Sequence, residues 1–166
     1  MLTRKGRRMT ELYEIKEEKE RFILLGVSQP DHNDTEESID ELEELVATAG
    51  GITVGRIIQN RLAIHPRTYI GKGKVEEVLE MAFETDATGV ICDDELSPAQ
   101  LRNLEEDLDM KVLDRTSLIL DIFAKRATTK EGKIQVELAQ LNYRLTRLVG
   151  RGKSLSRLAG GIGTRG

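Results

Sequence analysis

The chain has 166 residues, of which 39% are hydrophobic and 33% charged, and its formal net charge at pH 7 is −4. The single Cys92 excludes an internal disulfide framework, and no apolar run is long enough for a membrane span or the core of a signal peptide. These features indicate a cytoplasmic protein with room for one domain and an appendage. Trp is absent and 4% of the residues are aromatic, so a surface that stacks unpaired bases is not expected.

The first 20 residues lack a regular hydrophobic period and are expected to form a tail. Beyond them, short apolar runs alternate with segments whose apolar residues recur at helical spacing. The runs predict strands over 21–27, 52–58, 88–92 and 111–113. The periodic segments predict helices over 35–48, over 75–83, from residue 98 onward and over 115–127. Strands that alternate with helices predict an α/β domain over 21–127, with a mainly parallel sheet that carries helices on both faces.

Three of these helices begin with capping signals. Asp34 stands three residues before Glu37, which is the spacing of a capping box. Ser97 is followed by a proline and then by Gln100, so this segment supplies an N-cap, a first-turn proline and a capping-box glutamine in order. Asp114 is the expected N-cap of the helix over 115–127.

The last expected helix, over 128–150, has a different pattern. Its apolar residues step by four and three positions, as in a coiled coil, instead of forming the broader stripe of a helix that lies on a sheet. We call these residues the leucine seam: Ile134, Leu138, Leu141, Leu145 and Leu148. At about 1.5 Å per residue, such a helix extends roughly 30 Å. A seam of this kind needs a partner, and no other segment of the chain repeats heptads.

Charge is segregated along the chain. Residues 125–166 contain ten Lys or Arg and two Glu, for a net charge of +8, whereas residues 1–124 contain 15 basic and 27 acidic residues, for −12. Segregation of this kind is typical of proteins that bind a polyanion.

The basic residues gather at the end of the long helix and in a glycine-rich segment, 151–166, that is expected to be a loop. Arg144, Arg147 and Arg151 stand at i, i+3 and i+7, so they share one helix face. Beyond Arg151, the loop contributes the basic residues Lys153, Arg157 and Arg165. Glycines let the backbone approach a crowded surface, and arginine binds phosphate with two parallel hydrogen bonds. We call residues 144–166 the basic tip, and the sequence predicts that it binds a polyanion.

Two other segments have chemistry to offer. The first, which consists of Gly71, Lys72, Gly73 and Lys74, can present amide N–H groups to a phosphate at a helix start, or can be a tight turn with solvated lysines. The acidic run 93–95 follows a buried strand and can hold a hydrated Mg²⁺, or can be a polar loop that leads into the next helix cap. Gly152–Ser154 is no Walker A motif, because the position that requires glycine is Arg147.

Several strings of this sequence resemble the HflX family of ribosome-associated GTPases. They are Pro66–Glu77, Asp93–Glu105, Val112–Ala127, Gln135–Leu141 and Gly160–Gly166. The resemblance implies that the chain holds an N-terminal α/β domain and the first arm of a helical hairpin, and that it stops within the hairpin loop. In that family the loop enters the large ribosomal subunit near the peptidyl transferase centre, and the GTPase domain follows the second arm.

The same resemblance implies a role without chemistry in this chain. GTP and Mg²⁺ would act in the GTPase domain, which the chain lacks, and the intact protein would separate stalled or idle ribosomes, as in a stress response. The implied partners are rRNA of the large subunit and the missing GTPase domain, and the chain is expected to be a monomer. The residues expected at the rRNA are Arg144, Arg147, Arg151, Lys153, Ser154, Arg157 and Arg165, with Gly160, Gly161 and Gly163 allowing close approach.

Two alternatives remain open at this point. The first is a nucleotide-binding α/β domain that uses residues 72–74 together with Asp93 and Asp94. The second is a coiled-coil module whose leucine seam dimerises with another copy of the chain.

Overall fold

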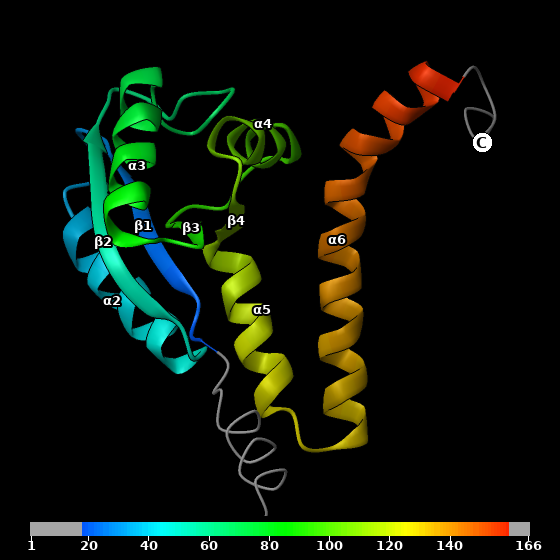
Figure 1. The fold of residues 1–166 in the computed structure, drawn as a ribbon. Coiled ribbons are helices and arrows are strands. Elements are labelled where there is room, and N and C mark those ends of the chain that lie inside the picture. The colour runs from blue at the N-terminus through cyan, green and yellow to red at the C-terminus, as the bar shows by residue number, and fades with distance from the viewer. Residues whose placement is uncertain (1–17, 160–166) are drawn as a thin grey trace, which may run out of the picture.

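The computed structural model describes residues 18–159, with side chains described for residues 18–148. The expected tail is described only from residue 18. The elements are β1 (Arg21–Ser28), α2 (Thr35–Thr48), β2 (Ile52–Asn60), α3 (Lys72–Thr85), β3 (Gly89–Cys92), α4 (Pro98–Leu108), β4 (Lys111–Asp114), α5 (Arg115–Arg126) and α6 (Lys130–Ala159). The expected alternation of strands and helices is confirmed, and Figure 1 shows it as a sheet with packed helices and one long helix at its side.

The four strands pair in the order β2-β1-β3-β4, and each neighbouring pair is parallel. The α/β class and the parallel sheet are therefore confirmed. The parallel strands have their carboxyl ends on the same side of the sheet, where Cys92, the last residue of β3, pairs with Asp114, the last residue of β4. At the start of β3, Gly89 lets the backbone lie close to β4 and to Phe22 of β1. A Cβ at this position would lie 3.0 Å from both the Lys111 carbonyl oxygen and the Phe22 ring.

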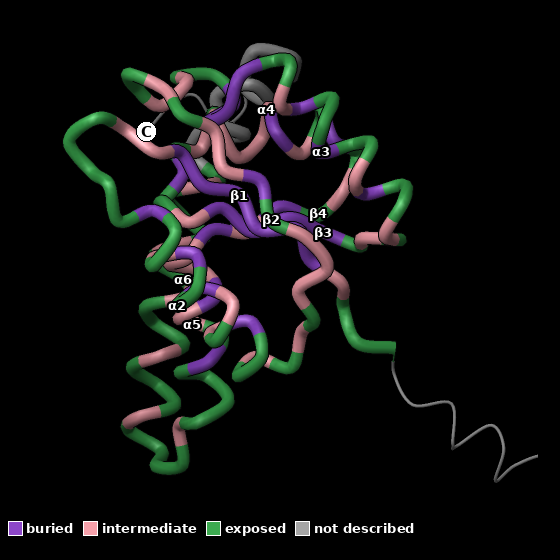
Figure 2. The backbone as a smooth tube through the Cα atoms, turned by 90° about the vertical axis from the view of Figure 1, so that its left-hand side faces the viewer, coloured by how far each residue is buried: buried purple, intermediate pink, exposed green. Residues whose placement is uncertain are grey.

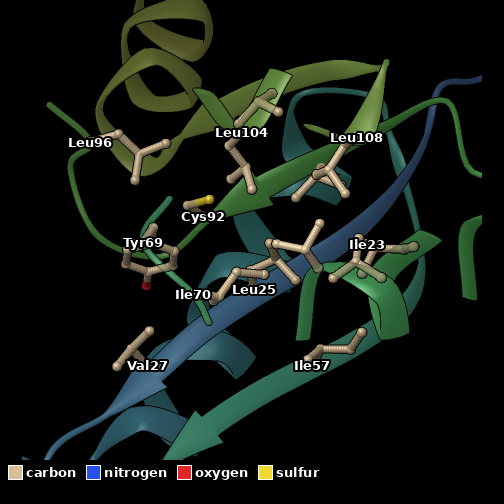
Figure 3. Close-up of a cluster of buried hydrophobic side chains, with 14 of the residues drawn as sticks. Ile23, Leu25, Val27, Ile57, Tyr69, Ile70, Cys92, Leu96, Leu104 and Leu108 are labelled. Carbon is tan, nitrogen blue, oxygen red and sulfur yellow. The ribbon is translucent and has the colours of Figure 1, made fainter. Parts of the chain in front are cut away.

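Successive residues of β1 enter two cores, one on each face of the sheet. Ile23 and Leu25 lie in the core on one face, which includes Val78 of α3 and Leu104 of α4. The neighbouring Leu24 lies in the core on the other face, which includes residues of α2 and α5. Figure 3 shows the first of these cores, and Figure 2 shows buried residues concentrated on the strands. The expectation of helices on both faces is thus confirmed.

Two of the three predicted helix caps are present. Ser97 and Asp114 each accept a hydrogen bond from the backbone N–H three residues later and complete a capping box. The Asp34 side chain makes no capping hydrogen bond with the described residues, although Asp34 stands at the N-cap position of α2. Its backbone has ψ 15°, whereas ψ is 158° at Ser97 and 173° at Asp114. An N-cap side chain reaches the first turn from an extended backbone, so the prediction for Asp34 was wrong.

The long helix α6 continues to Ala159, beyond the end expected at residue 150. The loop expected over 151–166 is therefore not found at 151–159, and residues 160–166 lie outside the described part. Gly150 and Gly152 each disfavour a helix by only about 1 kcal/mol relative to alanine. The leucine, arginine and alanine residues that follow favour a helix, which offsets this cost.

Two faces of α6 have different surroundings. Figure 1 shows α6 beside α5, to which it is joined by residues 127–129. The partly buried residues of α6 are Gly132, Val136, Gln140, Tyr143 and Arg147, at steps of four, four, three and four positions. The residues of the leucine seam are each between 51% and 56% exposed. The α6 face that packs most closely on the α/β domain is thus not the seam, whose residues all stay more than half exposed.

Candidate nucleic-acid interface

The α/β domain holds α6 through a buried carboxylate at the end of β4. Asp114 is 1% exposed and accepts hydrogen bonds from the backbone N–H groups of Leu96 and Ser117, both at 3.0 Å. Its Oδ2 also accepts the hydroxyl of Tyr143 and Nη2 of Arg147, the latter at 2.9 Å. We call Asp114, Tyr143 and Arg147 the Asp114 anchor.

Within the Asp114 anchor, the two α6 side chains also contact each other. The Arg147 guanidinium carbon lies 4.2 Å from the centre of the Tyr143 ring, a cation–π arrangement. Burial raises the pKa of Tyr143, and its hydrogen bond to Asp114 raises that pKa further. The phenol therefore stays protonated at neutral pH and donates to the carboxylate.

The structure changes the interpretation of the arginine row. The Arg147 side chain is only 14% exposed and binds Asp114 of the α/β domain, so it does not point toward the end of the helix. Arg144 is exposed and lines an open groove of about 410 Å³ between α6 and the α/β domain. The groove is also lined by Leu101, Leu120 and Leu148. The Arg147 guanidinium is thus bound within the chain whereas Arg144 is exposed, and the contact of these residues with a polyanion stays a prediction.

The remaining residues of the basic tip are placed only in part. The backbone of α6 carries Arg151, Lys153, Ser154 and Arg157 on its last turns, not in a loop. Their side chains lie outside the described ones. Gly160, Gly161, Gly163 and Arg165 lie outside the described residues altogether.

The glycine–lysine segment at the start of α3 is a turn whose groups already have partners. The Gly71 N–H donates to Gln59 Oε1 at 2.8 Å, and Lys74 Nζ pairs with Glu77 at 2.8 Å. Lys72 and Gly73 are exposed. Of the two interpretations, the geometry favours a helix entry with surface lysines, because one amide and one ammonium group expected at a phosphate bind within the chain.

The acidic run after β3 likewise binds within the chain. Asp93 Oδ1 lies 2.7 Å from Nη2 of Arg115, and Asp94 accepts the Tyr69 hydroxyl at 2.6 Å. In a parallel sheet of this order, the ligand crevice is expected beyond the ends of β1 and β3. Here the fully buried Tyr69 and Ile70 pack against this end of the sheet. Among the described residues, no group of three acidic, His or Cys side chains could hold a metal ion.

Sequence reasoning did not find the Asp114 anchor. Asp114 was recognised only as a helix cap, and Tyr143 was not singled out. One signal was available: Tyr143 is the only aromatic residue after Phe123, and it stands four positions before Arg147 on a face other than the seam. Its partner Asp114 lies 29 residues earlier, and no spacing rule links residues at that separation.

The sequence of this chain is similar to those of known GTP-binding proteins. The family described as "GTP-binding GTPase N-terminal" matches residues 36–124, and "GTP-binding GTPase Middle Region" matches residues 126–166. The protein "GTPase HflX" of Lacrimispora saccharolytica is 67% identical over 158 residues, 95% of this chain and 37% of that protein. The chain belongs to the HflX family of GTPases. The protein "GTPase HflX" of Escherichia coli K12 is 47% identical over 89% of this chain and 34% of that protein.

Solved structures agree with this assignment. A GTP-binding protein from the hyperthermophilic archaeon Sulfolobus solfataricus, in complex with GDP, is 25% identical and superimposes with a TM-score of 0.60 over 80% of this chain and 40% of that chain. A mutation variant, G235P, of a protein named SsGBP is 27% identical with a TM-score of 0.62. The chain thus spans a little over a third of the length of the HflX relatives, and the region that it spans is their N-terminal part. Over residues 18–159, no helix is long and apolar enough to cross a membrane.

Proposed function

We propose that this chain is the ribosome-binding region of an HflX-type GTPase and that its basic tip contacts rRNA of the large subunit. The observation that carries the proposal is the segregation of charge, with +8 on residues 125–166 and −12 on the rest. The structure supports it by placing the start of the basic tip on a helix of 30 residues at the side of the acidic domain. A long basic helix gives an ionic, sequence-independent contact to phosphates, which suits a chain poor in aromatic residues.

The proposed rRNA contacts are Arg144, Arg151, Lys153, Ser154, Arg157 and Arg165, with Gly160, Gly161 and Gly163 allowing close approach. Arg147 is left out of this set because Asp114 binds its guanidinium. In the whole protein, GTP and Mg²⁺ would act in a GTPase domain that this chain does not include. That domain would govern the separation of ribosomes in the cytoplasm.

The rRNA contact can be tested by reversing the charge of Arg151, Lys153 and Arg157 to glutamate and measuring co-sedimentation with purified large subunits over a salt series. Each phosphate contact contributes about 0.7–0.9 to the slope of log affinity against log salt. We therefore expect weaker binding and a slope lower by about 2–3.

The matched control reverses Arg126 at the end of α5 together with Lys130 and Lys133 in the first turn of α6, all three of which are exposed. This triple variant changes the net charge by the same amount but should keep the wild-type slope. Equal losses in both variants would indicate general attraction to the ribosome surface, and no loss in either would refute the proposal.

A second candidate function is favoured by the open leucine seam, which can pair with the seam of another copy as a coiled coil. Sedimentation velocity over a range of protein concentrations separates the two candidates. A monomer at all concentrations is expected if the seam is not used between copies. A dimer that Leu141→Asp abolishes, while Leu62→Asp at a position 89% exposed outside the seam does not, would support the coiled coil.

A further inference from the structure

α6 is attached to the α/β domain at two places that lie far apart along the helix. The first is the short connection 127–129 after α5, and the second is the Asp114 anchor. Tyr143 stands 13 residues after the start of α6, so about 20 Å of helix separates the two attachments. Figure 1 shows α6 standing beside α5 and rising past it toward α4.

Between these attachments the contact is small and mostly polar. The leucine seam is more than half exposed, so its apolar area does not hold α6 on the domain. The domain-facing positions are a glycine, a valine and the polar Gln140, followed by Tyr143 and Arg147. Gln140 makes only an exposed hydrogen bond to Asp121, at 3.3 Å. A helix is usually held on its domain by the burial of an apolar face, and α6 buries little apolar area between its two attachments.

The Asp114 anchor supplies the strong, directional contact that is otherwise missing between α6 and the α/β domain. Its carboxylate is fixed, because the backbone N–H groups of Leu96, in the loop before α4, and of Ser117, in the first turn of α5, hold it in place. Its α6 partners are a charged and a neutral donor, and hydrogen bonds to charged groups are the stronger kind. Both groups donate to the same Oδ2 of Asp114. Together with the connection 127–129, they therefore fix the angle between α6 and the α/β domain.

We propose that Tyr143 and Arg147 are positioning residues, which act through Asp114 to fix the direction of α6 relative to the α/β domain. The basic end of α6 lies beyond them, and Ala159 is a further 12 residues, about 18 Å, along the helix. A small rotation at 127–129 is therefore amplified at the basic end. The inference goes beyond the proposed function, because it concerns the direction of the helix whatever its end binds.

The direction can be measured with two spin labels, one at Glu76→Cys on α3 and one at Thr146→Cys on α6, in a Cys92→Ala background. Both labelled positions are exposed. Pulsed electron paramagnetic resonance then gives the distribution of distances between them. A pivot of about 20° at the connection would move residue 146, about 24 Å along the helix, by about 8 Å.

The test variant combines Tyr143→Phe with Arg147→Gln, and the matched control is Arg144→Gln, which removes an exposed arginine from the same turns. We expect one narrow distribution in the parent and in the control, and a broadened distribution with a shifted mean in the test variant. Tyr143→Phe alone should broaden it by a smaller amount. Unchanged distributions in the test variant would overturn the proposal.

Stability alone must not be mistaken for positioning. Distances are therefore compared at a temperature where circular dichroism shows the α/β domain folded in every variant. A lower melting temperature with an unchanged distance distribution would also refute the proposal. The positioning role is decided by the distances in this variant, and the proposed function by large-subunit binding of the Arg151, Lys153 and Arg157 reversal, so the failure of one proposal is distinguishable from the failure of the other.

Discussion

Replacement of Asp114 by alanine is expected to lower the free energy of unfolding by about 3–5 kcal/mol, measured by urea denaturation with circular dichroism. The side chain is 1% exposed and accepts hydrogen bonds from four donors. Its removal leaves a guanidinium that is 14% exposed without its closest carboxylate. It also removes the cap of α5 and leaves the buried N–H of Leu96 and the partly buried N–H of Ser117 without this acceptor, and each loss is destabilising.

Asp121→Ala is the control for this measurement. Asp121 lies on α5, is exposed, and accepts an exposed hydrogen bond from Gln140 of α6. Its replacement is expected to change stability by no more than about 0.5 kcal/mol. If Asp114→Ala were as mild as this control, the carboxylate would not be the group that joins α6, α4 and α5.

The elements of the α/β domain could be predicted because each carries its own signal. The helix over 35–48 was found with correct ends from its apolar spacing and the capping-box spacing of Asp34 and Glu37. Ser97 with Gln100 likewise marks the start of α4 through contacts within one turn. The cap at Asp34 shows the limit of that signal. Asp34 and Glu37 are the residue types of a capping box, but the backbone at Asp34 is not extended. Residue types at this spacing do not determine the backbone angle ψ at the cap.

The candidate site could be predicted only where it depends on local pattern. The leucine seam and the net charge of the tip follow from residues close in sequence. The role of Arg147 does not, because it depends on Asp114, which is 33 residues away and becomes a neighbour only when β4 is placed at the edge of the sheet. The end of α6 was misjudged for a different reason, since two glycines are a modest cost that a long helix tolerates.

The Asp93–Arg115 ion pair is the second place where a large effect is expected. Arg115 is 21% exposed and Asp93 8%, and two nitrogens of the guanidinium donate to Asp93 Oδ1 at 3.1 and 2.7 Å. The same guanidinium binds Glu41 at 2.9 Å and the Ser38 carbonyl at 2.8 Å, so it joins the end of β3 to α2 and α5. Arg115→Met is expected to cost about 3–5 kcal/mol, because it leaves a buried carboxylate without a counter-ion.

A double-mutant cycle separates the ion pair from the other contacts of Arg115. In Asp93→Asn with Arg115→Met, no unpaired charge remains at residue 93, so the loss in unfolding free energy should be smaller than the sum of the single losses by about 1–3 kcal/mol. Arg67→Met is the matched control, because Arg67 is 61% exposed and lies 3.9 Å from Asp107. A surface pair of this kind contributes at most about 1 kcal/mol. Additive losses at Asp93 and Arg115 would mean that Arg115 stabilises the domain through its contacts with Ser38 and Glu41 of α2 and not through Asp93.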